Sequence, residues 1–176
     1  VDLASGERVD GEIWVSALPP DILFRVLPEE VVDAVQVFRH LAGFETSPIV
    51  NIHLFYDRRV IDGEFLAIVD SQLQWVFNKG PILEASGIPG SSYAGGQHIC
   101  ISASAAWEYI DRTREEISDE FIQEMAEVFP AARDAKVLRS VVVKQRNATF
   151  RSVPGVNYLR PNSVTSIPNL FLAGEW

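Results

Sequence analysis

An alternation of apolar and polar side chains that starts at Pro48 limits the folds open to this chain more than any other feature. The segment PIVNIHLFYDRRV sets Asn51, His53 and Phe55 against apolar residues. The apolar set is Ile49, Val50, Ile52, Leu54 and Tyr56. Side chains two residues apart lie on one face of a strand, so this period predicts a β-strand with one apolar and one polar face. Such a strand is typical of an antiparallel sheet that is covered on one side.

Four further segments predict strands that extend this sheet. They are EFLAIVD, LQWVFNKG, QHICISASAA and KVLRSVVVKQRNATF. Asp70, Ser71 and Gln72 lie between the first two segments and predict a hairpin turn. A stretch rich in Gly, Pro and Ser, from Pro81 to Gly96, predicts an irregular segment. The sequence therefore predicts a sheet of about five strands.

Three helical segments are predicted beside the sheet. The first begins at Pro19-Pro20-Asp21, because proline presets φ and lacks only a donor that the first helical turn leaves unused. The second begins at Pro28-Glu29-Glu30, with acids in its first turn, and ends before Gly43. Ser118 is the predicted N-cap of the third. The predicted fold class is α+β, a mostly antiparallel or mixed sheet covered by helices.

Both ends of the chain predict short buried strands of a second sheet. Residues Ile13 to Ala17 are mostly apolar, and the closing stretch IPNLFLAGEW is an apolar run bounded by Pro168 and Gly174. Short apolar runs between turn residues fit core strands. The end of the last strand is therefore expected to deliver Glu175 to a surface.

The charge of the chain argues against nucleic acid as a partner. Its 176 residues carry 15 Lys and Arg against 24 Asp and Glu, a formal net charge of -9, whereas phosphate binding needs clustered cations. The single cysteine, Cys100, excludes an internal disulfide and is predicted to be a small core residue. No apolar run approaches the length of a membrane-spanning helix. The predicted location is the cytoplasm, and a peripheral contact with the inner face of the membrane stays open.

No residue pattern marks a catalytic or metal site. His40, His53 and His98 stand far apart in the sequence without a second ligand at metal-binding spacing, so no metal is predicted. No serine lies in a nucleophile-elbow pattern, and no residue is assigned as a general acid or base. Four aromatic residues either line an apolar ligand pocket or belong to the core, since aromatic side chains dominate both environments. They are Trp75, Phe77, Trp107 and Tyr158.

Three segments resemble the C-terminal half of the phytoene desaturase and amine oxidase superfamily of flavoproteins. They are GEIWVSALPPDILFRVLP, PIVNIHLFYDRRV with LQWVFNKG, and RNATFRSVPGVNYLRPNSVTSIPNLFLAGEW. The nearest resemblance is to the squalene-associated members, the hydroxysqualene dehydroxylases. It implies an FAD-binding domain with a substrate domain inserted in it. Residues 1–20 and 161–176 would then be strands of the FAD-binding domain, and residues 21–160 the substrate domain.

The resemblance also implies which residues meet the ligands. The implied FAD-binding residues are Ser16, Ala17, Ala173, Gly174, Glu175 and Trp176. The glycine lets the backbone approach the cofactor, and the carboxylate of Glu175 can accept a hydrogen bond from a ribityl hydroxyl. The expected substrate-binding residues are Trp75, Phe77 and Tyr158.

The superfamily's Gly-rich fingerprint, whose helix N-terminus binds the pyrophosphate, does not occur in the sequence. The expectation is a fragment that binds FAD only as part of the full-length protein. Exposed edges of the terminal strands further predict self-association of the fragment.

The function expected from these observations is FAD-dependent oxidation or reduction of a long apolar isoprenoid, of squalene or carotenoid type, including removal of hydroxyl from hydroxysqualene. Flavin supplies the redox chemistry, while the protein positions the substrate and excludes water. Two alternatives stay open. One is an amine or porphyrinogen oxidase of the same superfamily, and the other is a binding module without catalysis that holds a lipid or a partner protein.

Overall fold

The computed structural model describes residues 1–86 and 95–174. The chain divides into two compact units, and the residues of each unit pack mainly against one another. The first joins Val1–Thr46 to Phe150–Trp176, and the second is the continuous segment Ser47–Thr149. These units are defined by contacts within the chain. The division into an FAD-binding and a substrate domain, with boundaries after residues 20 and 160, stays a prediction.

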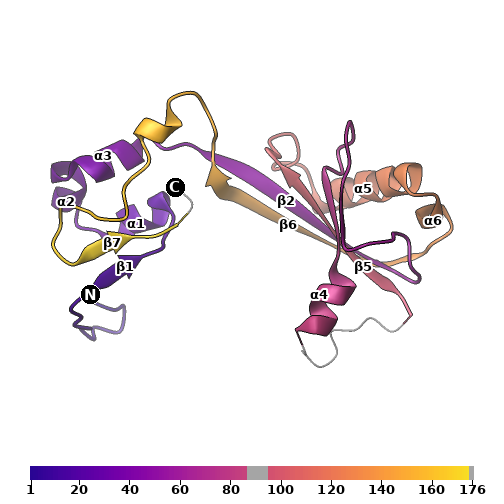
Figure 1. Ribbon diagram of the computed structural model, residues 1–176, viewed down its shortest axis with the longest axis horizontal. Coiled ribbons are helices and arrows are strands. Elements are labelled where there is room, and N and C mark those ends of the chain that lie inside the picture. Colours follow the sequence, from indigo (N-terminus) through magenta and orange to yellow (C-terminus); the bar gives the residue numbers. More distant parts are fainter. Residues whose placement is uncertain (87–94, 175–176) are drawn as a thin grey trace. The chain divides into compact units, whose positions relative to one another are not determined.

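The second unit is built on the predicted five-stranded sheet (Figure 1). Its strand order is β3-β4-β5-β2-β6, and β3–β4, β4–β5 and β5–β2 pair antiparallel. The strands are β2 (Thr46–Tyr56), β3 (Phe65–Ala67), β4 (Trp75–Asn78), β5 (Gln97–Ser104) and β6 (Val137–Phe150). Strands β3 to β6 lie within predicted segments, and β2 begins at Thr46, before the segment that is predicted from Pro48 onward.

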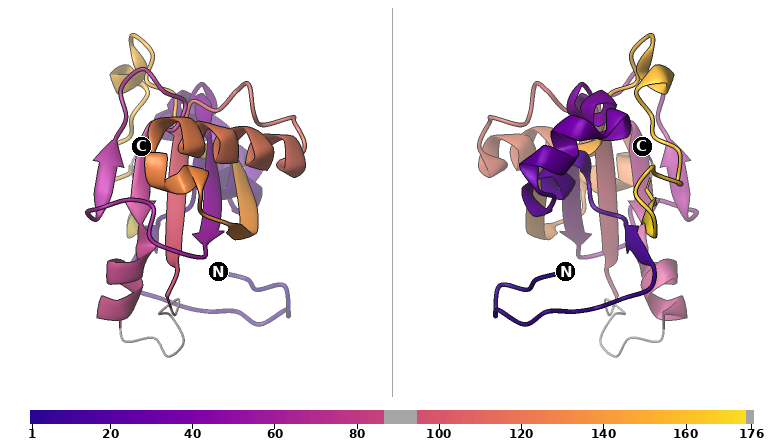
Figure 2. Two further views of the ribbon diagram at one scale, coloured as in Figure 1. Left: turned by 90° about the vertical axis from the view of Figure 1, so that its right-hand side faces the viewer. Right: turned by 90° about the vertical axis from the view of Figure 1, so that its left-hand side faces the viewer.

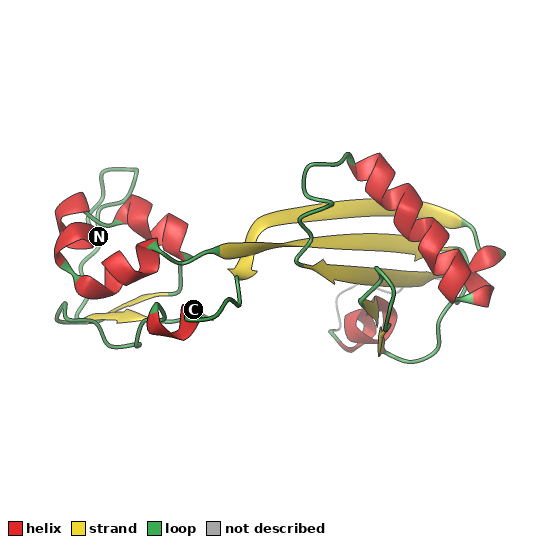
Figure 3. Cartoon of the chain, turned by 90° about the horizontal axis from the view of Figure 1, so that it is seen from above, coloured by secondary structure: helices red, strands yellow, loops and turns green. Residues whose placement is uncertain are grey.

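Helices α5 (Arg114–Val128) and α6 (Pro130–Arg133) accompany the sheet, and α5 lies along one of its faces (Figure 3). The core forms between α5 and the apolar side chains of that face. Its fully buried members include Val50, Ile52, Leu54, Val76, Ile99, Ile101, Ile117, Phe121 and Met125. Of the predicted apolar set of β2, Val50, Ile52, Leu54 and Tyr56 are buried, whereas Ile49 lies on the opposite, partly exposed face.

Helix α5 begins earlier than predicted. Its N-cap is Thr113, whose hydroxyl accepts from the backbone N–H of Glu116 while the Glu116 carboxylate accepts from the backbone N–H of Thr113. This capping box satisfies two N–H groups that would otherwise lack partners, and it outcompetes a single serine cap. The predicted cap, Ser118, is buried inside the helix, where its hydroxyl bonds that of Ser140 at 2.7 Å.

Two other helix predictions need correction. The helix expected between Pro28 and Gly43 is two helices, α2 (Glu29–Ala34) and α3 (Gln36–Ala42), because Val35 is extended with φ -95 and ψ 116. A β-branched residue favours that conformation. The stretch expected to be irregular contains most of helix α4 (Lys79–Ala85), which the side chain of Asn78 caps by accepting from the N–H of Gly80.

The first unit contains the second sheet that the chain ends predict. Strands β1 (Trp14–Ser16) and β7 (Leu170–Leu172) pair in parallel. Helices α1 (Pro20–Val26), α2 and α3 accompany them, and the 3-10 turn η1 spans Val156–Tyr158 (Figure 2, right view). A small core joins Leu23 and Phe38 from the helices to Leu172 of β7.

Among residues 1–86 and 95–174, no helix combines the length and the apolar character that crossing a bilayer would require.

Candidate functional site

The carboxyl ends of β1 and β7 form the first candidate site. The two strands run parallel, and the backbone N–H of Ala173 donates to the carbonyl of Ser16 at 2.8 Å. The structure thus brings together Ser16 with Ala173, two of the expected cofactor-binding residues, from opposite ends of the chain. Ligands of parallel sheets bind beyond the carboxyl ends of the strands.

A small pocket of about 60 Å³ opens at this edge. It is lined by Pro161, Asn162, Ser163, Leu172, Ala173 and Gly174. Ser163 is held there because its carbonyl accepts from the N–H of Leu172 at 2.8 Å. Gly174 has φ 144, a backbone conformation that residues with a Cβ rarely adopt. Glu175 and Trp176, the other two expected residues of this strand end, lie outside the described residues.

The second candidate site is the sheet face of the second unit that is turned away from α5, here called the outer face. Trp75 and Phe77 lie on it, as strand alternation predicts, and Val76 lies in the core with no exposed surface. The Trp75 side chain is 44% exposed, so the structure excludes its burial in the core.

Three aromatic side chains form a continuous surface on the outer face, here called the aromatic wall. Phe65 of β3 pairs with Phe77 of β4, and Trp75 is two residues before Phe77. Ring centroids are 6.3 Å apart for Trp75 and Phe77 and 6.4 Å apart for Phe65 and either partner. An exposed aromatic surface of this kind can hold an apolar ligand.

A polar group that the sequence did not reveal lies beside the aromatic wall. Register places His53 of β2 opposite Cys100 of β5, and Cys100 opposite Phe77 of β4. His53 Nδ1 is 3.1 Å from His98 Nε2, and Cys100 Sγ is 3.9 Å from His53 Nε2. The prediction that Cys100 is a core residue is wrong, since it is half-buried on the outer face.

Burial makes these imidazoles hard to protonate. Burial, and then the positive charge of Lys79, lower the pKa of His53. The pKa of His98 falls to about 4, through burial first and then through the charges of His53 and Lys79. Burial also raises the pKa of the Cys100 thiol. Both imidazoles and the thiol are therefore neutral at neutral pH.

His98 also borders a cleft of about 250 Å³. The other lining residues are Arg59, Asn78, Gly80, Pro81, Glu84, Gly96 and Gln97. The His98 ring stacks on Phe55 with centroids 4.2 Å apart, and the Arg139 guanidinium lies 5.7 Å from the Phe55 ring centroid. In the described part of the chain, no three His, Cys, Asp or Glu side chains are grouped so that they could hold a metal ion.

The remaining aromatic candidates lie elsewhere. Tyr158 belongs to the first unit, where its side chain is 87% exposed. Trp107 follows β5 in the second unit and is also exposed, so neither residue belongs to the core. A substrate contact of Tyr158 stays a prediction.

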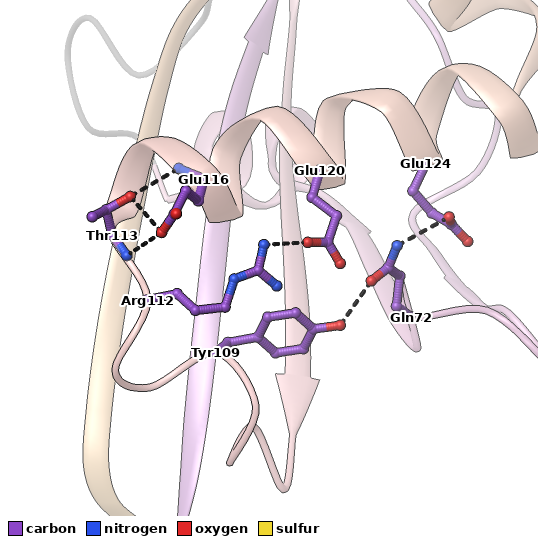
Figure 4. A network of polar contacts seen from close by, with 7 residues as sticks. All are labelled: Gln72, Tyr109, Arg112, Thr113, Glu116, Glu120 and Glu124. Atoms are coloured by element: carbon purple, nitrogen blue, oxygen red, sulfur yellow. Dashed lines mark hydrogen bonds and ion pairs between the residues drawn. The ribbon is translucent and has the colours of Figure 1, made fainter.

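The hairpin that carries the aromatic wall is fixed from the opposite side of the sheet by Glu124 of α5. Its carboxylate accepts from the Ser71 hydroxyl at 2.7 Å and from the Gln72 amide at 3.1 Å. The Gln72 carbonyl oxygen in turn accepts from the Tyr109 hydroxyl at 2.7 Å, and Arg112 pairs with Glu120 next to it (Figure 4). Helix α5 thereby holds the β3–β4 turn through side-chain contacts.

Replacing Glu124 with alanine is expected to destabilise the chain by about 1–3 kcal/mol, because hydrogen bonds to a charged acceptor are lost and the two donors lose their partner. Urea unfolding followed by circular dichroism measures this difference. Glu127→Ala is the matched control on the same helix, since Glu127 is exposed and its carboxylate accepts from the Gln123 amide at 2.9 Å. Equal stability of the two variants would contradict the anchoring role of Glu124.

Comparison with known protein families gives one match over the entire sequence. The model of a family described as flavin containing amine oxidoreductase matches residues 1–176.

Individual relatives are similar along nearly the whole chain. A 15-cis-phytoene desaturase of an Oncidium hybrid cultivar is 29% identical over 191 residues, which cover 99% of this chain and 30% of that protein. A 15-cis-phytoene desaturase of Synechococcus elongatus is 27% identical over 186 residues, covering 97% of this chain and 36% of that protein. The chain thus spans about a third of the length of these relatives.

A solved structure supports the fold alone. An oxidoreductase from Methanosarcina mazei superimposes with a TM-score of 0.65 at 18% sequence identity, covering 95% of this chain and 38% of that one. The α+β arrangement of the five-stranded sheet, its helices and the small parallel sheet therefore recurs in a known oxidoreductase.

Proposed function

Since the chain belongs to the flavin containing amine oxidoreductase family, we propose that it is part of an FAD-dependent oxidoreductase that dehydrogenates a long apolar isoprenoid. The observation that carries the proposal is the exposed aromatic wall, which has no role in the core of the second unit. The names of the two relatives favour a phytoene-type hydrocarbon over hydroxysqualene. The squalene-type reaction is therefore the second candidate.

The pocket at the carboxyl ends of β1 and β7 suits the part of FAD around its ribityl chain. This pocket of about 60 Å³ accommodates a fragment of FAD, and Gly174 leaves room for the backbone to approach it. Ser16 and Ala173 hold the two strand ends together, and Asn162 and Ser163 offer polar groups. Glu175 follows directly in the sequence and could accept a hydrogen bond from the ribityl chain. When bound, FAD accepts the hydride that the substrate loses.

The aromatic wall suits the hydrocarbon. Phe65, Trp75 and Phe77 present ring faces without hydrogen-bonding groups, apart from the indole N–H of Trp75. Contact with these rings removes apolar surface of the substrate from water, which favours binding. The carboxylates of a porphyrinogen would need charged partners, and none of the three wall residues carries a charge.

Purification of the full-length protein tests the proposal directly. We expect a bound flavin, and we expect anaerobic addition of phytoene to bleach its absorbance. Reoxidation of the chemically reduced flavin by hydroxysqualene, or bleaching of the oxidised flavin by a primary amine, would favour the corresponding alternative. A protein without flavin would leave only a binding module.

Replacing Trp75 and Phe77 with alanine in that protein is expected to raise KM for phytoene about tenfold for each ring, because each loses apolar contact worth over 1 kcal/mol. FAD content should not change. The matched control is Trp107→Ala, since Trp107 is an exposed tryptophan outside the aromatic wall. An unchanged KM in the double variant would show that the aromatic wall does not contact substrate.

A further inference from the structure

We propose that the His53–His98 pair accepts the proton that the substrate releases during dehydrogenation. This inference rests on the proposed function and adds a catalytic role that the sequence pattern did not suggest. It follows from the position of the pair, from its hydrogen bond and from its surroundings.

The position is fixed by strand register. Phe65, Phe77, Cys100 and His53 are successive cross-strand partners from β3 to β2, so they form one row across the sheet. His98 belongs to the next row, where it is the partner of Phe55. A hydrocarbon chain on the aromatic wall therefore has this imidazole pair as its neighbour on the same face.

The chemistry requires a proton acceptor. Forming a C=C bond breaks two C–H bonds of adjacent carbons. One hydrogen leaves with both electrons as a hydride to the flavin, and the other leaves as a proton while its electron pair becomes the new π bond. A hydrocarbon has no group that can take this proton, so an acceptor has to lie beside the substrate, and a neutral imidazole suits this role.

The imidazole pair suits this task because its two rings are neutral and already hydrogen-bonded. At 3.1 Å, one of the facing nitrogens of His53 and His98 donates and the other accepts, so one proton lies in the hydrogen bond between the two rings. When the pair takes up a further proton, one ring becomes an imidazolium and donates to its neutral partner. Such charge-assisted hydrogen bonds are stronger than those between neutral groups. The pair can therefore accept one proton from the substrate.

The charged groups around the pair favour its neutral state and offer a way out for the proton. Lys79 lies close enough for its charge to lower the pKa of both histidines, and the Arg139 guanidinium lies over Phe55, on which His98 stacks. The thiol of Cys100 contacts His53. Glu84 and Arg59 line the cleft that His98 borders, so the proton can leave through this polar cleft to water.

The test uses the full-length holoenzyme with the variants His53→Gln and His98→Gln, which keep hydrogen-bonding groups but cannot accept a proton at neutral pH. We expect the rate of flavin reduction by phytoene in a single turnover to fall about 100-fold in each variant. FAD content and KM should stay within a factor of about two of wild type. His40→Gln is the matched control, because His40 is an exposed histidine on α3 of the other unit.

A second measurement needs no variant. The wild-type rate is expected to be constant from alkaline to neutral pH and to fall as pH drops below the ordinary histidine value of 6.5 toward the lowered value of about 4, because only the neutral pair accepts a proton. Unchanged rates in both glutamine variants, or a wild-type rate without this acidic decline, would overturn the inference while leaving the proposed function intact. A wild-type protein that phytoene does not reduce would overturn both.

Discussion

Full-length protein carrying Gly174→Val is expected to lose its FAD during gel filtration. Gly174 has φ 144 at the end of β7, and a valine there would add strain of about 1–3 kcal/mol and place a branched side chain beside the 60 Å³ pocket. Since about 1.4 kcal/mol corresponds to a tenfold change in affinity, strain of this size should weaken FAD binding about 5- to 150-fold. The ratio of flavin to protein absorbance after gel filtration measures the loss.

The matched control for this variant is Gly155→Val. Gly155 also has a positive φ of 89, but no atom lies within 4 Å of the Cβ that a side chain would add there. A valine at Gly155 therefore also adds backbone strain, while the end of β7 stays intact. Retention of FAD in both variants, or its loss from both, would contradict a specific role of Gly174 at the cofactor.

The largest loss of stability is expected from Phe121→Ala. Phe121 of α5 has no exposed surface, and its ring meets the ring of Tyr109 edge-on at a centroid distance of 5.3 Å. Removing a buried phenyl ring costs about 3–5 kcal/mol, through lost burial and the cavity left behind. That is a large part of the about 5–15 kcal/mol by which domains are stable. Urea unfolding of the chain gives the difference in unfolding free energy.

Ile122→Ala provides the comparison for Phe121. Ile122 is the next residue of α5 and is only partly buried against the same core. Its truncation leaves a site open to water rather than a closed cavity, so its effect should be smaller. A Phe121→Ala variant that unfolds at the same urea concentration as Ile122→Ala would show that the interior between α5 and the sheet collapses around the missing ring.

The strands of this fold could be predicted because their signals are local. Alternation from Pro48 onward identified β2, and its predicted apolar residues lie in the core apart from Ile49. The terminal strands were also found from short apolar runs, and their pairing as a separate sheet is confirmed. The first residues of helices were harder to predict. Ser118 and Thr113 both suit an N-cap, and only the capping box that Thr113 forms with Glu116 decides between them.

The sequence predicts only part of the candidate site. Alternation predicts that Trp75 and Phe77 share one face, and the structure confirms this face. The proximity of His53 and His98 depends on the register between β2 and β5, and a shift by one residue would move one of them to the core face. Two histidines separated by 45 residues carry no local signal of that register.

The parallel pairing of β1 with β7 has a consequence for the order of folding. Its partners, Trp14 with Leu170 and Ser16 with Leu172, are separated by the whole second unit, which is itself a continuous segment. During synthesis, all residues of the second unit are therefore made before β7, and β1 stays unpaired until β7 has been made. Closing so long a loop costs entropy unless the intervening chain is already compact. The strand end that we assign to the cofactor is thus assembled after the face that we assign to the substrate.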